Sequence, residues 1–444
     1  MENMLSVGID LGTSTTQMVV SRLRVENTAS AFAVPHMEIK DREVLYRSRV
    51  HFTPLLSPDT IDAAAIRRLI AQEYEKANIS PEQVQTGAVI ITGETARKEN
   101  AQQVLNALAE FAGEFVVATA GPALESILAA RGAGADQAAK DRGKFVLHMD
   151  IGGGTSNLAL FDPDGKLIDT GCLNVGGRLM KFDEQGKPVY VSPVLQGFDT
   201  TDPEKLVKEL AEVLEEAAGL RPAGNRLKKL ITDKTVKLPQ EPVIVSFSGG
   251  VADLIDREEL NWLLYGDLGV LLGRAIRQSK LCAGTYLLGR ETIRATVIGA
   301  GSYATELSGS TISYSGVEFP LQNLPVIQLS EISAQEIKEK LSPYKGEAAA
   351  LFLEGAVSPS FDQISLMADE ITQGIKCLSE PLVVAVEHDM AKALGQALQV
   401  RLGNRVPMIC IDGIHIPTGS YLDIGAPVAG GTAVPVIVKT LAFE

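Results

Sequence analysis

Two segments of the chain decide the fold. The first is Ser6-Val7-Gly8-Ile9-Asp10-Leu11-Gly12-Thr13-Ser14-Thr15-Thr16, and the second is Leu147-His148-Met149-Asp150-Ile151-Gly152-Gly153-Gly154-Thr155-Ser156-Asn157. Each combines a short apolar strand, an aspartate, a glycine-rich turn with hydroxyl residues, and the start of a second strand. Such a turn presents backbone N–H groups to an anion, and glycine allows close approach. Two copies predict two similar lobes that hold one polyphosphate between them.

The size and charge of the chain limit what it can be. Its 444 residues are too many for one ordinary core and predict two or three domains. Hydrophobic residues make up 45% and charged residues 22%, as in a globular protein. The net charge of −14 argues against nucleic acid as a partner, because phosphate backbones bind basic surfaces. We therefore expect a cytoplasmic protein.

The cysteines and the apolar runs exclude further classes. No C-x-x-C pair occurs among the cysteines at positions 172, 282, 377 and 410, which argues against iron–sulfur and structural zinc sites. Isolated reduced thiols are expected instead. The N-terminal residues lack the pattern of a signal peptide, and no apolar run reaches the roughly 18 residues of a membrane span. We expect no membrane partner.

Strand and helix patterns alternate along the chain, so the expected fold class is α/β. The predicted units are a first lobe over 1–142, a second lobe over 143–315 and a C-terminal α/β region over 316–444. This last region is either a separate domain or packed on the first lobe.

Several connections carry their own expectations. Residues 131–144 are expected to form a loop, and residues 294–298 a strand. The basic segment 221–242 is either a solvated linker or a contact patch for an acidic partner. Asp267-Leu268-Gly269 is expected to start a helix, whereas Asp423-Ile424-Gly425 is expected to be a loop.

The paired turns suggest how phosphate would be bound. Asp10 and Asp150 are expected to be catalytic, because an aspartate beside the phosphates can hold Mg²⁺ through its water shell. The metal neutralises charge as the terminal phosphoryl group leaves. The alternative for either motif alone is an ordinary hairpin. The expected phosphate-binding residues are Gly12, Thr13, Ser14, Thr15, Gly152, Gly153, Gly154 and Thr155.

A third glycine turn follows a predicted buried strand at Ser248-Gly249-Gly250. Because Gly249 and Gly250 carry no side chains, a flat base and its ribose could lie against the backbone there. A purely structural turn is the alternative. In a chain with two phosphate turns, we expect these glycines to bound the nucleotide base.

Other polar residues have a functional and a structural interpretation. Glu387-His388-Asp389 could hold a metal, but without a second ligand cluster a polar turn is favoured. His148 is expected to be a hydrogen-bonded strand histidine rather than a catalytic one. Arg178 and Lys181, which follow Gly176-Gly177, could reach a phosphate, and a surface pair is the favoured alternative.

The order of the motifs resembles the superfamily of actin, heat-shock chaperone and sugar-kinase ATPases. Residues 120–126 resemble the crossing helix before the second phosphate turn, and residues 174–177 resemble the glycine turn after it. The resemblance covers about residues 4–310. It implies two actin-like (ribonuclease H-like) lobes around a nucleotide cleft, with ATP as the ligand and Mg²⁺ as its metal.

Two further stretches, Ile91 to Ala101 and Gly299 to Ile312, are similar to the EutA family of ethanolamine ammonia-lyase reactivating factors. The similarity runs over nearly the whole chain. It implies a chaperone-like ATPase that releases damaged cobalamin from ethanolamine ammonia-lyase, so that intact adenosylcobalamin can enter. It also implies work alongside the bacterial ethanolamine-utilisation microcompartment.

The chain departs from the superfamily pattern at two positions. The chaperones carry a glutamate directly before the proline of the crossing helix, whereas here Gly121 precedes Pro122 and Glu125 lies one turn further on. Asn157 stands where the chaperones have an acidic residue. Fewer carboxylates around the metal and water predict slow hydrolysis, which suits a conformational switch.

Two other function classes stay open. A small-molecule kinase of the same superfamily would need a carboxylate base beside an acceptor hydroxyl. An actin-like filament protein would need self-complementary surfaces. The oligomeric state is not fixed by the sequence, and a homodimer is one arrangement to be considered.

Overall fold

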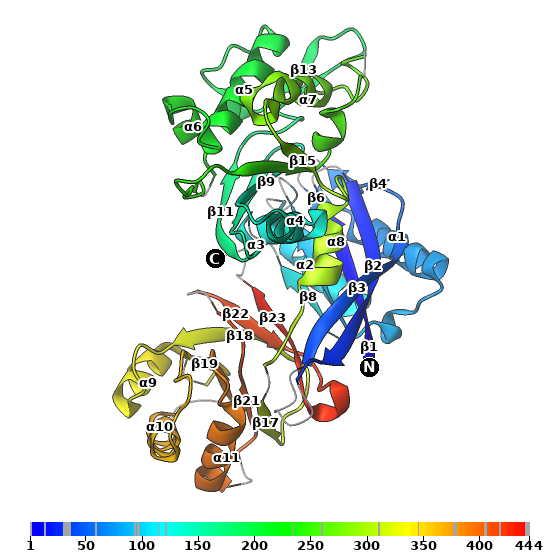
Figure 1. Ribbon diagram of the computed structural model, residues 1–444. Coiled ribbons are helices and arrows are strands. Elements are labelled where there is room, and N and C mark those ends of the chain that lie inside the picture. The colour runs from blue at the N-terminus through cyan, green and yellow to red at the C-terminus, as the bar shows by residue number, and fades with distance from the viewer. Residues whose placement is uncertain are drawn as a thin grey trace.

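A computed structural model describes residues 2–439, except the short segments 13–14, 30–36, 58–59, 93–94, 96–97, 114, 120–121, 233, 259–260, 310, 345, 376–379, 404–405 and 417–418. The expected roles of Thr13, Ser14 and Gly121, and the thiol of Cys377, lie outside the described residues. In Figure 1 the C-terminal helices occupy one end of the molecule and helices α5 to α7 the other, with the N-terminal sheet between them.

The first sheet is built from β1 (Glu2–Leu11), β2 (Thr15–Asn27), β3 (Met37–Arg47), β7 (Thr86–Ile91) and β8 (Val116–Thr119). Its order is β3-β2-β1-β7-β8, and the short strand β4 (His51–Phe52) also pairs with β2. The first three strands are antiparallel, and β7 and β8 continue the sheet parallel to β1. The parallel strand β7 is buried along its length, as an apolar run of this kind predicts.

The second sheet repeats this plan. It contains β9 (Val146–Ile151), β10 (Ser156–Phe161), β11 (Leu167–Leu173), β14 (Ile244–Ser248) and β15 (Tyr286–Leu288). Its order is β11-β10-β9-β14-β15, again with three antiparallel strands followed by two parallel ones. Both sheets therefore have the arrangement expected of the ribonuclease H-like fold, and the predicted α/β class is confirmed.

Two helices link these sheets by crossing over. Helix α3 (Pro122–Ala133) follows the first sheet in the chain, yet its Ser126 hydroxyl donates to the Gly171 carbonyl of β11. Helix α8 (Ala295–Tyr303) follows the second sheet, yet its Ser302 hydroxyl lies 3.0 Å from the Ser21 hydroxyl of β2. Each helix thus covers the sheet of the other half.

Glycines let α3 and α8 cross in backbone contact. A Cβ at Gly132 of α3 would lie 1.9 Å from the carbonyl oxygen of Ala295, and one at Gly299 of α8 would lie 2.0 Å from that of Leu128. Both distances are far inside van der Waals contact, so only glycine fits either place.

The C-terminal residues form an eight-stranded sheet of order β16-β23-β22-β18-β19-β20-β21-β17. Its parallel strands, β18 (Leu321–Gln328) to β21, are linked by three helices that lie together in Figure 1. Ile437 of β23 packs with Ala88 and Ala300, so this sheet adjoins the first one. The remaining elements of the region are β16 (Glu306–Leu307), β17 (Ile312–Ser315), β19 (Ala350–Leu353), β20 (Leu382–Val386), β21 (Met408–Ile411), β22 (Tyr421–Ile424), β23 (Pro435–Lys439), α9 (Ala334–Leu341), α10 (Phe361–Gly374) and α11 (Ala391–Leu402).

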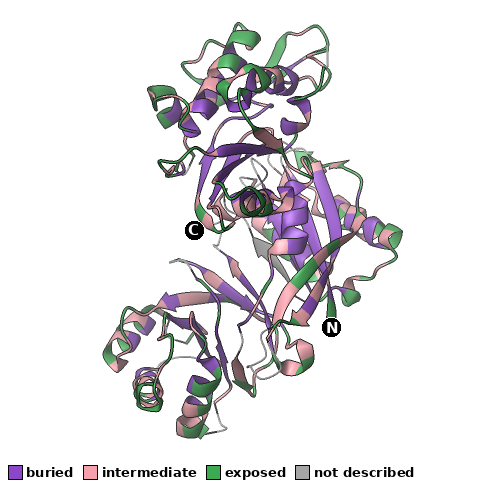
Figure 2. Cartoon of the chain, viewed as in Figure 1, coloured by how far each residue is buried: buried purple, intermediate pink, exposed green. Residues whose placement is uncertain are grey.

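Smaller elements complete the two N-terminal sheets. Figure 2 shows their strands mostly buried, while the outer faces of the helices are exposed. Short strands and helices surround the sheets, and these are β4 (His51–Phe52), β5 (Leu55–Ser57), β6 (Thr60–Ile61), β12 (Met180–Phe182), β13 (Pro188–Val191), α1 (Ala63–Ala77), α2 (Ala101–Ala112), α4 (Ala135–Arg142), α5 (Pro203–Ala217), α6 (Asn225–Leu230) and α7 (Gly269–Gln278). Single 3₁₀ turns lie at 81–83, 193–195, 252–254, 280–282, 342–344 and 429–431.

The loop expected over residues 131–144 was wrong. These residues complete α3 and form α4, whose ends are capped by Gly134 and Gly143 in the left-handed conformation. Ala135 and Ala139 of α4 are buried against the second sheet. The two glycines therefore mark helix ends, and the alanines form a packed face.

The strand expected at residues 294–298 was also wrong, because α8 begins at Ala295. All residues from 295 to 302 are buried, so the segment has no polar face from which a helical period could be recognised. The small residues from Gly299 to Ser302 belong to this helix and allow its close packing.

The other two loop expectations need correction as well. Asp423 lies in strand β22, where its buried carboxylate pairs with Lys439. Segment 221–242 is not simply a solvated linker, because it contains α6, with Leu230 buried. Two of its cations, Arg221 and Lys234, pair with acidic residues of this same chain.

Candidate functional site

The two glycine-rich turns are closed by the same backbone hydrogen bond. The Gly12 amide donates to the Thr15 carbonyl at 2.9 Å, and the Gly152 amide donates to the Thr155 carbonyl at 2.9 Å. Each turn closes a hairpin between the first two strands of its sheet. The hairpin interpretation is therefore correct as local structure, and it does not compete with a role in binding.

The aspartates before the turns are also held alike. A hydroxyl from the end of the neighbouring parallel strand reaches each carboxylate, from Thr92 to Asp10 at 3.1 Å and from Ser248 to Asp150. Burial raises the pKa of Asp10 to about 7, with hydrogen bonding to Thr92 opposing it and the charge of Asp150 adding to it. Burial raises the pKa of Asp150 to about 6, opposed by hydrogen bonds from Ser248 and Thr296.

An amide side chain stands directly opposite each aspartate in the hairpin register. Gln17 pairs with Asp10, and Asn157 pairs with Asp150. Gln17 Oε1 and Asn157 Oδ1 are both buried without a hydrogen-bond partner. Two carboxylates and two unsatisfied amide oxygens form a set of acceptors that fits a hydrated Mg²⁺ ion, whose bound waters are donors.

A cavity of about 410 Å³ is lined by Asp10, Asp150 and Gln17, and Asn157 adjoins it through its hydrogen bond with Glu125. It is lined by Asp10, Gly12 and Thr15 from the first turn and by Asp150 and residues 152–155 from the second. The structure thus brings together the described members of both predicted phosphate turns. The cavity is large enough for a nucleotide-sized ligand.

Glu125 is a further carboxylate in this cavity. It projects from α3, the crossing helix, and Asn157 hydrogen-bonds its side chain. Burial raises the pKa of Glu125 well above its usual range, and the charges of Asp10 and Asp150 add to this effect. Three carboxyls therefore share one buried space, which is a common feature of catalytic and metal-binding sites.

Gly249 and Gly250, the glycines expected at the base, line the cavity together with Val251 and Leu254. Gly249 has a φ of +90°, and a Cβ there would lie 2.3 Å from the Ile151 carbonyl oxygen. A Cβ at Gly250 would meet nothing within 4 Å. Gly249 is thus required by the fold, while Gly250 leaves open space beside the cavity.

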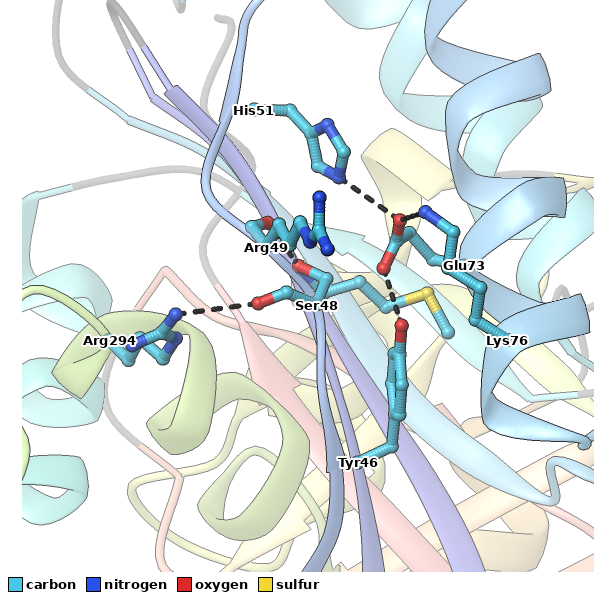
Figure 3. Close-up of polar contacts among 8 residues, drawn as sticks. Tyr46, Ser48, Arg49, His51, Glu73, Lys76 and Arg294 are labelled. Carbon is cyan, nitrogen blue, oxygen red and sulfur yellow. Dashed lines mark hydrogen bonds and ion pairs between the residues drawn. The ribbon is translucent and has the colours of Figure 1, made fainter.

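The wall below the first turn is fixed by polar contacts (Figure 3). His51, Tyr46 and Lys76 converge on the fully buried Glu73, at 3.1, 2.6 and 2.5 Å. Burial acts to raise the pKa of Glu73, but the three donated hydrogen bonds hold it below its usual value. This network anchors β4, whose residue Phe52 is 83% exposed and lines the cavity.

The expected strand histidine is confirmed. His148 is fully buried, with its ring nitrogens 3.1 and 2.8 Å from the hydroxyls of Ser246 and Ser248. Burial lowers the pKa of His148 to about 3, so the ring is neutral. The expected reduced thiols at Cys172, Cys282 and Cys410 are buried, and none of the three forms a disulfide among the described residues. The interpretation of Glu387-His388-Asp389 as a polar turn stays a prediction.

Comparison with known proteins decides the family. The family model described as "Ethanolamine utilisation protein EutA" matches residues 2–444. The chain belongs to the EutA family. The ethanolamine ammonia-lyase reactivase EutA of Escherichia coli (strain K12) is 38% identical to it, over 99% of this chain and 98% of that one. The protein of the same description from Salmonella typhimurium is 37% identical, with the same coverage.

Solved structures give more distant likenesses to this EutA-family chain. The ethanolamine utilization protein EutJ from Carboxydothermus hydrogenoformans is 17% identical, with 67% of this chain and 89% of that one covered and a TM-score of 0.36. An Aquifex aeolicus member of the Ppx/GppA family is 12% identical, with 67% and 97% covered and a TM-score of 0.41. The fold described above rests on the strand order of the two sheets.

Two cavity residues of this EutA-family chain, Glu125 and Gln17, are not identified as site residues by sequence reasoning. Glu125 was noted only as a departure from the chaperone pattern. Gln17 lies in an apolar strand. Its position opposite Asp10 indicates a site residue only when the register of the hairpin is known. Arg178, for which the sequence left a phosphate contact and a surface pair open, lines the cavity and pairs with Asp267, and its contact with phosphate stays a prediction.

Among the described residues, no helix is both long and apolar enough to cross a membrane.

Proposed function

We propose that this protein is an ATP-dependent reactivating factor for ethanolamine ammonia-lyase. It releases inactive cobalamin from the lyase, so that adenosylcobalamin can bind again. The curated relatives that share 37–38% of its residues are named as reactivases of this lyase. The lyase is accordingly the proposed partner, and the ethanolamine-utilisation microcompartment is the proposed place of work.

One observation carries the nucleotide part of the proposal. Two hairpins closed by the same backbone hydrogen bond, one from each half of a duplicated fold, face one cavity with an aspartate beside each. A polyphosphate presents anionic oxygens to both turns at once, which a single hairpin cannot exploit. Bound between the halves, ATP would draw them together, and its loss would let them part.

Each residue has a proposed task. Asp10 and Asp150 hold the waters of Mg²⁺, while the amide oxygens of Gln17 and Asn157 accept from the same waters. Mg²⁺ supplies charge neutralisation as the terminal phosphoryl group departs. Glu125, between the two aspartates, orients the attacking water. Gly249 and Gly250 bound the base.

The nucleotide proposal is tested by titration calorimetry of the full chain with ATP, in the presence and absence of Mg²⁺. We expect saturable binding that depends on Mg²⁺ and is lost in Asp150→Ala. A matched control is Asp164→Ala, which removes an aspartate from the turn before β11. Equal binding by all three proteins would refute the assignment of the site, and no binding by any would refute ATP as the ligand.

A further inference from the structure

Arg178 is placed against the second glycine turn by its own backbone. The Arg178 amide donates to the Gly153 carbonyl at 2.6 Å, and the preceding Gly177 amide donates to the Gly152 carbonyl at 3.0 Å. A Cβ added at Gly153 would lie 3.3 to 3.5 Å from three carbons of the Arg178 side chain. The side chain therefore lies over the turn proposed to bind phosphate.

Asp267 holds the guanidinium group from the other side. Arg178 Nε donates to Asp267 Oδ2 at 3.2 Å, and the second oxygen of Asp267 accepts from the Gly269 amide at 2.8 Å. The Asp267 side chain is only 9% exposed, while that of Arg178 is 31% exposed. The carboxylate is thus fixed by the start of α7, and it in turn fixes the arginine.

This arrangement leaves the two terminal nitrogens of the Arg178 guanidinium group available to donate hydrogen bonds to a ligand. The bond to Asp267 uses Nε, and among the described residues none is seen to accept a hydrogen bond from the two terminal nitrogens. Arginine matches phosphate because its fork can donate two parallel hydrogen bonds. Held at one edge, the fork points its remaining donors away from Asp267.

The cavity is rich in carboxyl groups, so binding of an anionic polyphosphate there requires a cation. Its lining contains five carboxyl groups, including Asp253 and Asp267, and only two arginines, Arg178 and Arg257. A polyphosphate brings further negative charge into this space. Arg257 is exposed, whereas Arg178 is half-buried and contacts the second turn directly.

We propose that Arg178, positioned by Asp267 over the turn at Gly153, is a binding residue that donates its terminal guanidinium nitrogens to the phosphate chain of the nucleotide. This inference rests on the proposed nucleotide function. It adds that Arg178 recognises the phosphates and not the nucleoside part of the ligand. It assigns Asp267 as a positioning residue, because that side chain acts through the arginine.

The test compares binding of Mg-ATP, Mg-ADP and adenosine to the wild-type full chain, Arg178→Gln and Asp267→Asn. In Arg178→Gln we expect Mg-ATP and Mg-ADP to bind about tenfold or more weakly, while the affinity for adenosine is unchanged. Asp267→Asn should weaken both nucleotides less, and Arg178→Lys should restore part of the loss, since lysine keeps the charge without the fork. In turnover, KM should rise while kcat at saturation changes little.

Lys181 offers a matched control. It is exposed, does not line the cavity and lies 5.5 Å above the Tyr190 ring, so Lys181→Gln removes a nearby cation without touching the turn. It should bind all three ligands as the wild type does. Wild-type affinity for Mg-ATP in Arg178→Gln, or an equal loss of adenosine binding, would overturn the inference alone. Failure of the wild-type chain to bind Mg-ATP would overturn the proposed function as well.

Discussion

At the scale of single residues, the site concentrates carboxyl groups that burial makes hard to ionise. Asp10, Glu125 and Asp150 share one cavity, and the pKa of each is raised. The two aspartates could be predicted from the sequence, because each precedes a recognisable turn. Glu125 could not be predicted as a site residue, since its position depends on where α3 crosses the second sheet.

Asp10 makes a prediction about the dependence of stability on pH. Because its folded pKa of about 7 lies above the usual value of 3.8, the folded state holds a proton that the unfolded chain loses first. The free energy of unfolding should therefore fall as pH rises from about 4 to 7. Asp10→Asn should remove this pH-dependent contribution, stabilising the ligand-free protein at pH 8 by about 4 kcal/mol and hardly at pH 4.

Denaturant unfolding of both proteins at pH 4 and pH 8, without nucleotide, measures this difference. Identical pH dependence in wild type and Asp10→Asn would show that Asp10 ionises normally. The same variant should lose Mg²⁺-dependent nucleotide binding, so stability and function should change in opposite directions.

Glu125 makes a second prediction at this scale. If it orients the attacking water, Glu125→Gln should slow Mg-ATP hydrolysis by about 100-fold or more while the affinity for Mg-ATP stays within a few-fold of wild type. Single-turnover hydrolysis and equilibrium binding separate the two quantities. A variant that hydrolyses at the wild-type rate would remove Glu125 from the mechanism.

At the scale of elements, the fold depends on helices that exchange sheets. The strands around Asp10 and Asp150 could be predicted because hydrophobic runs end at turns. Helix α8 was taken for a strand, because its buried face extends all round and local patterns cannot distinguish the two. Gly132 and Gly299 let α3 and α8 meet. Their role could not be predicted, because each glycine contacts the backbone of a helix that is distant in the sequence.

The crossing of α3 and α8 predicts a large effect of one methyl group. Gly299→Ala would place a Cβ 2.0 Å from a backbone carbonyl oxygen, which forces the helices apart. We expect the free energy of unfolding to fall by about 2–4 kcal/mol, measured by denaturant titration. Gly284→Ala, where a Cβ would meet nothing within 4 Å, should change it by less than about 1 kcal/mol. Equal effects of both substitutions would show that the crossing is not tightly packed.

At the scale of the whole molecule, two duplicated sheets meet at one cavity, and a third sheet adjoins the first through β23. The domain boundaries at residues 142/143 and 315/316 and the homodimer stay predictions. The two turns line the same cavity, and helices α3 and α8 cross between the two sheets. A ligand gripped by both turns would therefore change the angle between the sheets, and with it the surfaces offered to a partner.

The most direct measurement is the recovery of lyase activity after blocking with cyanocobalamin. The blocked ethanolamine ammonia-lyase is incubated with this protein, Mg-ATP and adenosylcobalamin, and ethanolamine turnover is followed. The account predicts recovery with the wild-type chain, none when ATP is omitted, and none with Asp10→Ala. Recovery without ATP, or full recovery with Asp10→Ala, would contradict it.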